Sequence, residues 1–183
     1  MSDLFSRVDQ AQSNTDLTQE TEDRQFLKFY LHEGNKAMLS LQQITEVLRI
    51  KFSQIVPIPQ MPAWVMGVYN WRGDILWMID LGHLIGFNPW YQKSINRSNH
   101  TAIVLSPNKK KDNVQNKIDL GLVVARVEDL EVCNVAKIQI PPNKSVTTQL
   151  APFLEGYWLE QSKDMIMVLN GGSIVAAMPN NVR

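Results

Sequence analysis

Apolar residues occur along most of the chain in short runs that are separated by residues typical of turns. Leu27, Phe29 and Leu31 alternate with polar positions, a polar turn follows at residues 32–36, and apolar residues return at residues 37–41. Alternation with a period of two is typical of strands, because successive side chains of a strand point to opposite faces. The recurrence of short runs and turns predicts an all-β fold of the barrel or sandwich type.

The most informative local pattern is the segment 65–81, in which Gly73 and Asp74 stand between two runs of strand-forming residues. Glycine at the first central position is what a two-residue type II′ turn requires, so we predict a hairpin with these two residues as its turn. This register pairs Arg72 with Ile75 across the two strands. Both faces of the hairpin are rich in apolar residues, and we therefore expect it to be covered on both faces and to form the centre of the molecule.

The rest of the chain is predicted to consist of further strands and two short helical turns. Ile44, Val47 and Leu48 have the spacing i, i+3, i+4, which predicts a helical turn within residues 42–49. A second helical turn is expected at residues 81–86, where Gly86 closes it. The other extended segments are predicted at residues 55–62, 101–105, 120–127 and 138–142, and a three-stranded meander is predicted at residues 156–159, 165–169 and 174–178.

The distribution of polar segments suggests how the domain is divided. Residues 1–24 are polar without a sustained apolar period, so we expect a disordered N-terminal arm. Residues 25–180 then form a single domain, and a polar stretch near residue 95 divides its strands into groups at about 25–95 and 96–180, with strands that exchange between them. We therefore predict two small closed β-units that share a central interface, with only short helical turns.

Composition and charge exclude several classes of function. The 183 residues contain 18 Lys+Arg and 18 Asp+Glu, which gives zero net charge and disfavours nucleic acid as the main ligand. The single cysteine, Cys133, excludes an intramolecular disulfide and is typical of a reducing compartment. No apolar run approaches the roughly 18 residues of a membrane helix, and the N-terminus does not resemble a signal peptide. We expect a cytoplasmic protein without direct membrane insertion.

No catalytic or metal-binding motif is found along the chain. The three histidines, His32, His83 and His100, lack ligand partners at metal-binding spacing, and neither a nucleophile elbow nor a phosphate-binding loop is present. We therefore expect no enzymatic activity, no metal and no cofactor. Five tryptophans are many for this length, and tryptophan is enriched at protein interfaces, so an assembly surface is the functional class that composition favours.

Several segments together resemble the CheW family of bacterial chemotaxis coupling proteins. The resemblance rests on Ile58-Pro59, Met61-Pro62, Val65-Met-Gly-Val-Tyr-Asn-Trp-Arg-Gly-Asp-Ile-Leu, Ile79-Asp-Leu, Gly121-Leu-Val-Val, Pro141-Pro142 and Leu154-Glu-Gly-Tyr. It covers about residues 25–178 and implies two intertwined five-stranded β-barrels. Two departures are Trp77, where family members often have proline, and Ala125-Arg126, where they commonly carry an acidic residue.

The resemblance also implies a function. CheW-like proteins are non-catalytic adaptors that bind the regulatory domain of a CheA-type histidine kinase and the cytoplasmic tip of a methyl-accepting receptor, in arrays at the inner membrane. The tryptophan-rich form of the segment 69–77 is similar to that of cyanobacterial CheW-like proteins of phototaxis and pilus-based motility. The alternatives are a nucleic-acid-binding small barrel, which would need a basic and aromatic face, and an enzyme, which would need a convergent polar site.

Arg72 is the strongest candidate for a partner contact, since a rigid hairpin end presents it and the family motif includes it. The other candidates for a partner-binding site are Glu46, Val47, Gly67, Asn70 and Trp77. The alternative for Arg72 is an internal role, in which it pairs with Glu46, Asp74 or Asp80 or stacks on Trp77. Gly67 has a similar alternative, because a glycine in a strand often marks a close approach of two backbones.

Overall fold

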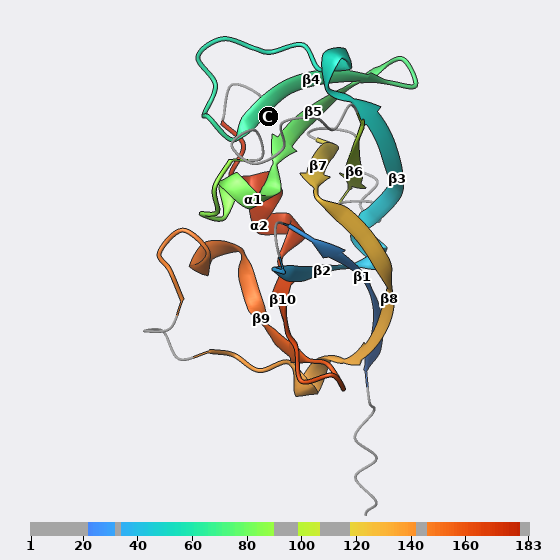
Figure 1. Cartoon of the computed structure of the whole chain (residues 1–183), viewed down its shortest axis with the longest axis vertical. Helices are drawn as coiled ribbons and strands as arrows, with labels where there is room; N and C mark the ends of the chain where they lie inside the picture. Colours follow the sequence, from blue (N-terminus) through green and yellow to red (C-terminus); the bar gives the residue numbers. More distant parts are fainter. Residues whose placement is uncertain (1–21, 32–33, 90–98, 107–117, 142–145, 180–183) are drawn as a thin grey trace, which may run out of the picture.

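Two five-stranded sheets form the core of the structure. The structure is a computed structural model, and it describes residues 22–31, 34–89, 99–106, 118–141 and 146–179. Sheet A has the strand order β8-β1-β2-β10-β9, and sheet B has the order β3-β6-β7-β5-β4. Figure 1 shows sheet B above sheet A, with two short helices near the level at which the sheets meet. The strands of sheet A are β1 (Asp23–Tyr30), β2 (Lys36–Ser40), β8 (Arg126–Asn134), β9 (Leu154–Leu159) and β10 (Met165–Leu169). Those of sheet B are β3 (Ile44–Lys51), β4 (Val65–Trp71), β5 (Asp74–Asp80), β6 (Asn99–Leu105) and β7 (Leu120–Val124).

The predicted all-β fold with two five-stranded units is confirmed, but the units are not closed barrels. In the part of the chain that the structure describes, no ladder joins the edge strands β3 and β4 of sheet B, or β8 and β9 of sheet A. One isolated bridge stands in each gap instead: Val56, which follows β3, pairs with Val68 of β4, and Gln139, which follows β8, pairs with Tyr157 of β9. Each sheet is therefore curled and only partly closed.

The strands are not divided between the sheets near residue 95. Sheet B is continuous in sequence from β3 to β7, whereas sheet A combines β1 and β2 with β8, β9 and β10. The first strand begins at Asp23, two residues before the predicted start of the domain, and residues 1–21 of the predicted arm lie outside the described residues. The polar stretch near residue 95 does not mark the boundary between the two sheets. Strands β6 and β7, which follow this stretch, pair with β3 and β5, which precede it, and all four belong to sheet B.

The side chains of the two curled sheets form three apolar cores. A central core lies where the sheets face each other and includes Leu27, Phe29, Leu39, Met167, Ile79, Ile103 and Leu122. Alternate residues of the same strands point inside each curl: Phe26, Met38, Cys133, Ile166 and Val168 in sheet A, and Leu76, Met78, Ala102, Val104 and Val123 in sheet B. The period-two pattern therefore serves two different cores, one on each face of the strands.

The hairpin of β4 and β5 has a different turn from the predicted one. Trp71 pairs with Asp74, so that Arg72 and Gly73 are the central turn residues. Both have positive φ, 56° and 93°, as a type I′ turn requires, and the predicted type II′ turn is wrong by one position. Because this shift moves every cross-strand pair by two residues, the faces are unchanged. The prediction that the hairpin is central is also wrong, because β4 is an edge strand and Ile75 is 72% exposed.

Residues 44–51 form strand β3, and only the preceding residues form a helical turn, the 3-10 helix η1 (Leu41–Gln43). The predicted helix over 42–49 is therefore wrong for most of its length. Ile44 and Ile50 are buried while Thr45, Val47, Arg49 and Lys51 are exposed, which is strand periodicity. β-Branched residues pack well on a pleated sheet, and they outweigh the i, i+3, i+4 spacing of three apolar side chains.

One short helix follows the β4–β5 hairpin, and another follows the β9–β10 hairpin. The predicted helix at residues 81–86 is α1 (Leu81–Leu84), but the predicted strand at residues 174–178 is wrong, because α2 (Gly171–Ala176) occupies this place. The side chain of Asn170 accepts a hydrogen bond from the Ser173 backbone amide and caps α2, and this capping signal was missed. The predicted strand 120–127 is likewise two strands, since the chain bends at Ala125 between β7 and β8.

Candidate functional site

The tip of the β4–β5 hairpin carries the side chains that the sequence singled out most strongly. Asn70, a predicted contact on β4 two residues before Arg72, accepts a hydrogen bond from the Gly73 backbone amide at 3.1 Å through its side-chain oxygen. This contact stabilises the turn and fixes the position of Arg72 between the two residues. Asn70 itself is exposed.

Arg72 is held by groups of two different strands. Its Nη2 lies 2.8 Å from Oε2 of Glu46 on β3, and its guanidinium carbon lies 5.4 Å from the centre of the Trp71 ring. The indole nitrogen of Trp71 donates a hydrogen bond to Oε1 of Glu46. Each oxygen of the Glu46 carboxylate therefore has a donor from the β4 end of the hairpin, and this polar contact joins the two edge strands of sheet B.

The exposure of this cluster is uneven. The side chain of Arg72 is 69% exposed and that of Glu46 is 24% exposed. An ion pair with so much solvent around one member contributes at most about 1 kcal/mol to folding. Among the internal partners considered from the sequence, the structure places Arg72 against Glu46, and the aromatic ring beneath it is Trp71 instead of Trp77.

The three remaining predicted site residues lie apart from this cluster. Val47 is 44% exposed and belongs to the exposed positions of β3, whereas Glu46 is half-buried. Trp77 is half-buried and packs against the central core. Gly67 is buried, and a β-carbon there would stand 2.1 Å from the carbonyl oxygen of Val56. The positions of Trp77 and Gly67 are those of packing residues.

Trp71 belongs to this cluster although the sequence motif did not single it out as a contact. Its neighbour Arg72 was chosen, and the pattern Trp-Arg within the motif was the available signal. Which of the five tryptophans approaches Glu46 depends on the curl of sheet B, which brings β3 and β4 together although they pair with different strands.

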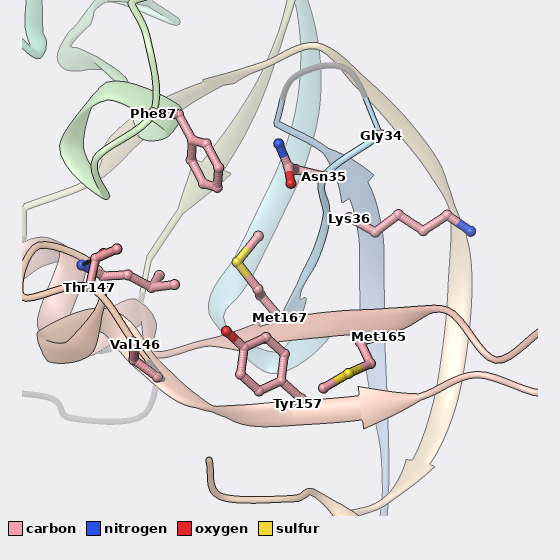
Figure 2. A pocket seen from close by; sticks show the side chains of 10 residues that line it. Gly34, Asn35, Lys36, Phe87, Val146, Thr147, Tyr157, Met165 and Met167 are labelled. Carbon is pink, nitrogen blue, oxygen red and sulfur yellow. Dashed lines mark hydrogen bonds between the residues drawn. The ribbon is translucent and has the colours of Figure 1, made fainter. Parts of the chain in front are cut away.

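A groove of about 290 Å³ lies between sheet A and Phe87, which follows α1, and no residue of the β4–β5 hairpin lines it. Figure 2 shows Phe87 on one wall and Tyr157, Met165 and Met167 on another. Val146 and Leu150 complete its apolar lining. None of the six predicted site residues lines this groove, so the groove and the predicted contact surface are separate features.

No group of three or more His, Cys, Asp or Glu side chains in the described ranges is arranged to hold a metal ion. No helix within these ranges has the length and apolarity needed to cross a membrane.

Comparison with known proteins assigns the family. The CheW-like domain matches residues 25–178. The structure is similar to that of the scaffolding protein TtCheW from Thermoanaerobacter tengcongensis, with a TM-score of 0.63 and 26% sequence identity, covering 80% of this chain and 88% of that chain. No curated protein sequence matches the chain. The chain belongs to the CheW-like domain family, which confirms the resemblance inferred from its motifs.

Proposed function

We propose that this chain is a non-catalytic signalling adaptor that couples a methyl-accepting chemoreceptor or photoreceptor to a CheA-type histidine kinase. Its partners are the regulatory domain of the kinase and the cytoplasmic tip of the receptor, and it acts in the cytoplasm at receptor arrays on the inner membrane. The output is chemotaxis, phototaxis or pilus-based motility. Membership of the CheW-like family and similarity to a CheW scaffolding protein support the adaptor role.

The backbone of Arg72 is the observation that most strongly supports a contact at the hairpin tip. With φ of 56°, Arg72 adopts a left-handed conformation that costs a residue with a β-carbon roughly 1–2 kcal/mol. Asparagine or glycine is preferred at this position of a type I′ turn. The exposed ion pair with Glu46 contributes at most about 1 kcal/mol to the stability of the fold. Arginine is therefore a poor choice for stability here, and strained positions of this kind occur often at functional sites.

The surroundings of Arg72 are suited to binding another protein. Arginine and tryptophan are enriched among residues that dominate binding energy, and Trp71 lies beneath the guanidinium. Ile75, which pairs with Asn70 across the hairpin, leaves an apolar side chain 72% exposed at the same tip. The hairpin holds these groups on its two strands and on the tight turn between them, so little backbone entropy is lost when a partner binds.

The alternative of nucleic-acid binding has no comparable support. Four of the described cations, Lys28, Lys36, Arg24 and Arg72, are held by carboxylates, and the chain as a whole carries zero net charge. Free cations gathered on one face would be expected of a protein that binds phosphates.

Replacing Arg72 with asparagine tests the proposal. Arg72→Asn relieves the backbone strain, so the thermal midpoint should stay unchanged or rise slightly. Binding to the kinase regulatory domain, the receptor tip or both should weaken by ~2 kcal/mol, about thirtyfold. Arg72→Lys should restore binding only in part, because an ammonium group lacks the planar fork of guanidinium.

Arg24→Asn is the matched control, because Arg24 of sheet A also forms an exposed ion pair, at 2.6 Å from Glu22. It should bind both partners like the unmodified chain. Full binding by folded Arg72→Asn would remove Arg72 from the contact surface. Absence of binding by the unmodified chain to any CheA-type regulatory domain or receptor tip would contradict the adaptor function itself.

A further inference from the structure

The two sheets are related to each other by a permuted repeat. The elements of sheet B and its helix follow one another in the chain as β3, β4, β5, α1, β6 and β7. The elements of sheet A match them one by one in the order β8, β9, β10, α2, β1 and β2, which runs to the end of the chain and continues from its beginning. The neighbours in each sheet also correspond, and the parallel pair β5–β7 matches the parallel pair β10–β2. Strands β1 and β2 therefore occupy in sheet A the places of β6 and β7, although they come first in the sequence.

Local features support this correspondence. The isolated bridge of Val68 matches that of Tyr157, and each bridging residue follows a buried glycine. A β-carbon on Gly67 would meet the carbonyl oxygen of Val56 at 2.1 Å, and one on Gly156 would meet that of Gln139 at 2.8 Å. Each helix is capped by the side chain before it, Asp80 for α1 and Asn170 for α2. Equivalent positions of the two sheets can therefore be compared.

The closing contact of sheet B has a counterpart in sheet A with different charges. In sheet B, an acidic residue of β3, Glu46, meets Arg72, the first residue after β4. In sheet A the edge strand β8 presents Asp129 and Glu131, and the first residue after β9 is Glu160. Both edges of sheet A therefore carry carboxylates, which repel each other unless a cation lies between them.

Lys28 is that cation. Its Nζ lies 2.5 Å from Glu160, 3.1 Å from Asp129 and 3.3 Å from Glu131. The Lys28 side chain is only 6% exposed, compared with 69% for Arg72. Burial opposes the charged form of Lys28, but its hydrogen bonds to the three carboxylates prevail and raise its pKa. The three carboxylates within 3.3 Å of Nζ thus keep the ammonium charged inside the curl.

The permuted repeat shows how unusual this position is. Lys28 pairs with Met38 on β2 as Val104 pairs with Gly121 on β7. Met38 and Gly121 occupy equivalent positions. Met38 pairs with Val168, two residues before Asn170, which caps α2. Gly121 pairs with Met78, two residues before Asp80, which caps α1. Sheet B therefore has a fully buried valine where sheet A has a lysine. A buried charge is tolerated only when it is paired and hydrogen-bonded, as Lys28 is.

We propose that Lys28 is an ionic clasp that closes sheet A, by joining the edge strand β8 to the turn that follows β9. Its ammonium is buried, in contrast to the exposed guanidinium of the Glu46–Arg72 contact between the edges of sheet B. Lys36 supports the same turn from β2, since its Nζ contacts Glu160 at 3.3 Å and Asp164 at 3.1 Å, whereas Glu128 of β8 acts on it only through longer-range electrostatic attraction. The clasp thereby fixes the β9–β10 hairpin, which carries Tyr157, Met165 and Met167 of the groove in Figure 2.

Amide hydrogen exchange at fixed pH, resolved by strand, tests the clasp. In Lys28→Met, a change that keeps the side-chain length and removes the charge, the amides of β9 and β10 should exchange at least ~100-fold faster, because three carboxylates lose their common partner. Exchange in β4 and β5 should stay within about threefold. Lys36→Met is the matched control: it removes a cation that contacts the same turn but leaves the contacts of Lys28 with β8 intact, and its effect should be about fivefold or less.

Two further variants keep the test decisive if Lys28→Met does not fold. Glu160→Gln removes the link to the turn but leaves Lys28 with Asp129 and Glu131, and it should accelerate exchange in β9 and β10 about tenfold. Lys28→Met combined with Glu160→Gln should exchange more slowly than Lys28→Met alone, or recover folding, because one repelling carboxylate is gone. Equal acceleration in both sheets, or no acceleration in β9 and β10 in Glu160→Gln, would overturn the proposal.

Discussion

Replacing Gly67 with alanine should destabilise the chain more than any other glycine-to-alanine change at a positive φ. Gly67 has φ of 137°, which residues with a β-carbon rarely adopt. A β-carbon there would stand 2.1 Å from the Val56 carbonyl oxygen, 2.7 Å from its carbon and 2.9 Å from Cα of Pro57. All three atoms belong to backbone, so no side chain can turn aside to make room.

The expected loss has two contributions. The unfavourable φ costs about 1–2 kcal/mol, and forcing β4 away from the segment around Val56 costs about 1–3 kcal/mol more. The sum is about 2–5 kcal/mol, which lowers the thermal midpoint of a chain of this length by roughly 4–20 °C. The Val56–Val68 bridge is the connection most directly affected, since Val68 is the next residue of β4.

Thermal unfolding of Gly67→Ala and Gly34→Ala provides the measurement and its control. Gly34 has φ of 83°, but a β-carbon on it would meet nothing within 4 Å, so only the cost of the backbone conformation remains. The difference between the two variants therefore isolates the close approach of Val56. Equal losses of stability would refute the reasoning, and would leave Gly67 as a candidate for partner contact instead of packing.

Two further predictions concern titrating groups of sheet A. Burial raises the pKa of Cys133 to about 12, so a thiol reagent at pH 8 should label the native protein only as fast as it unfolds, and rapid labelling of the folded chain would contradict this. The hydrogen bond from Lys28, aided by Ser162 and Lys36, lowers the pKa of Glu160 to about 2 from its ordinary 4.5. The stability it contributes should be complete above about pH 4.5 and lost as the pH falls to 2, so the urea midpoints of the unmodified chain and Glu160→Gln should converge over that interval; a constant gap would count against it.

Local patterns predicted most of the strands, and the errors arose where tertiary contacts choose between local alternatives. The β4–β5 hairpin shows this well. Gly73 is compatible with a turn that begins at residue 72 or at residue 73, and the sequence favours the second because it keeps Arg72 out of a left-handed conformation. The observed turn places Trp71 and Arg72 against Glu46, which lies on another strand. The turn preferences of residues 70–75 could not reveal these contacts with Glu46, because it lies on another strand.

The site was predictable in part for the same reason. The family motif identified Arg72, and Glu46 was among its possible internal partners, but 26 positions separate the two residues in the sequence. The contact depends on the curl of sheet B, which brings β3 toward β4 without a ladder between them. A pattern within a single strand contains no information on such a gap between edges.

Lys28 shows the deeper limit of reading periodicity in this fold. The alternation of Leu27, Phe29 and Leu31 with polar positions predicts a strand, and in a half-buried strand the intervening positions, which include Lys28, would face solvent. In a curled sheet, however, the second face lines an inner core, and Phe26 and Lys28 are 3% and 5% exposed. Because both faces are buried, a polar residue in the alternation does not indicate solvent, and the lysine must instead find carboxylates inside the curl. Those carboxylates come from β8 and from the turn after β9, more than 100 residues away in the sequence. The permuted repeat is what brings them to a strand from the beginning of the chain, so the ionic cluster follows from the topology of sheet A and not from any local motif.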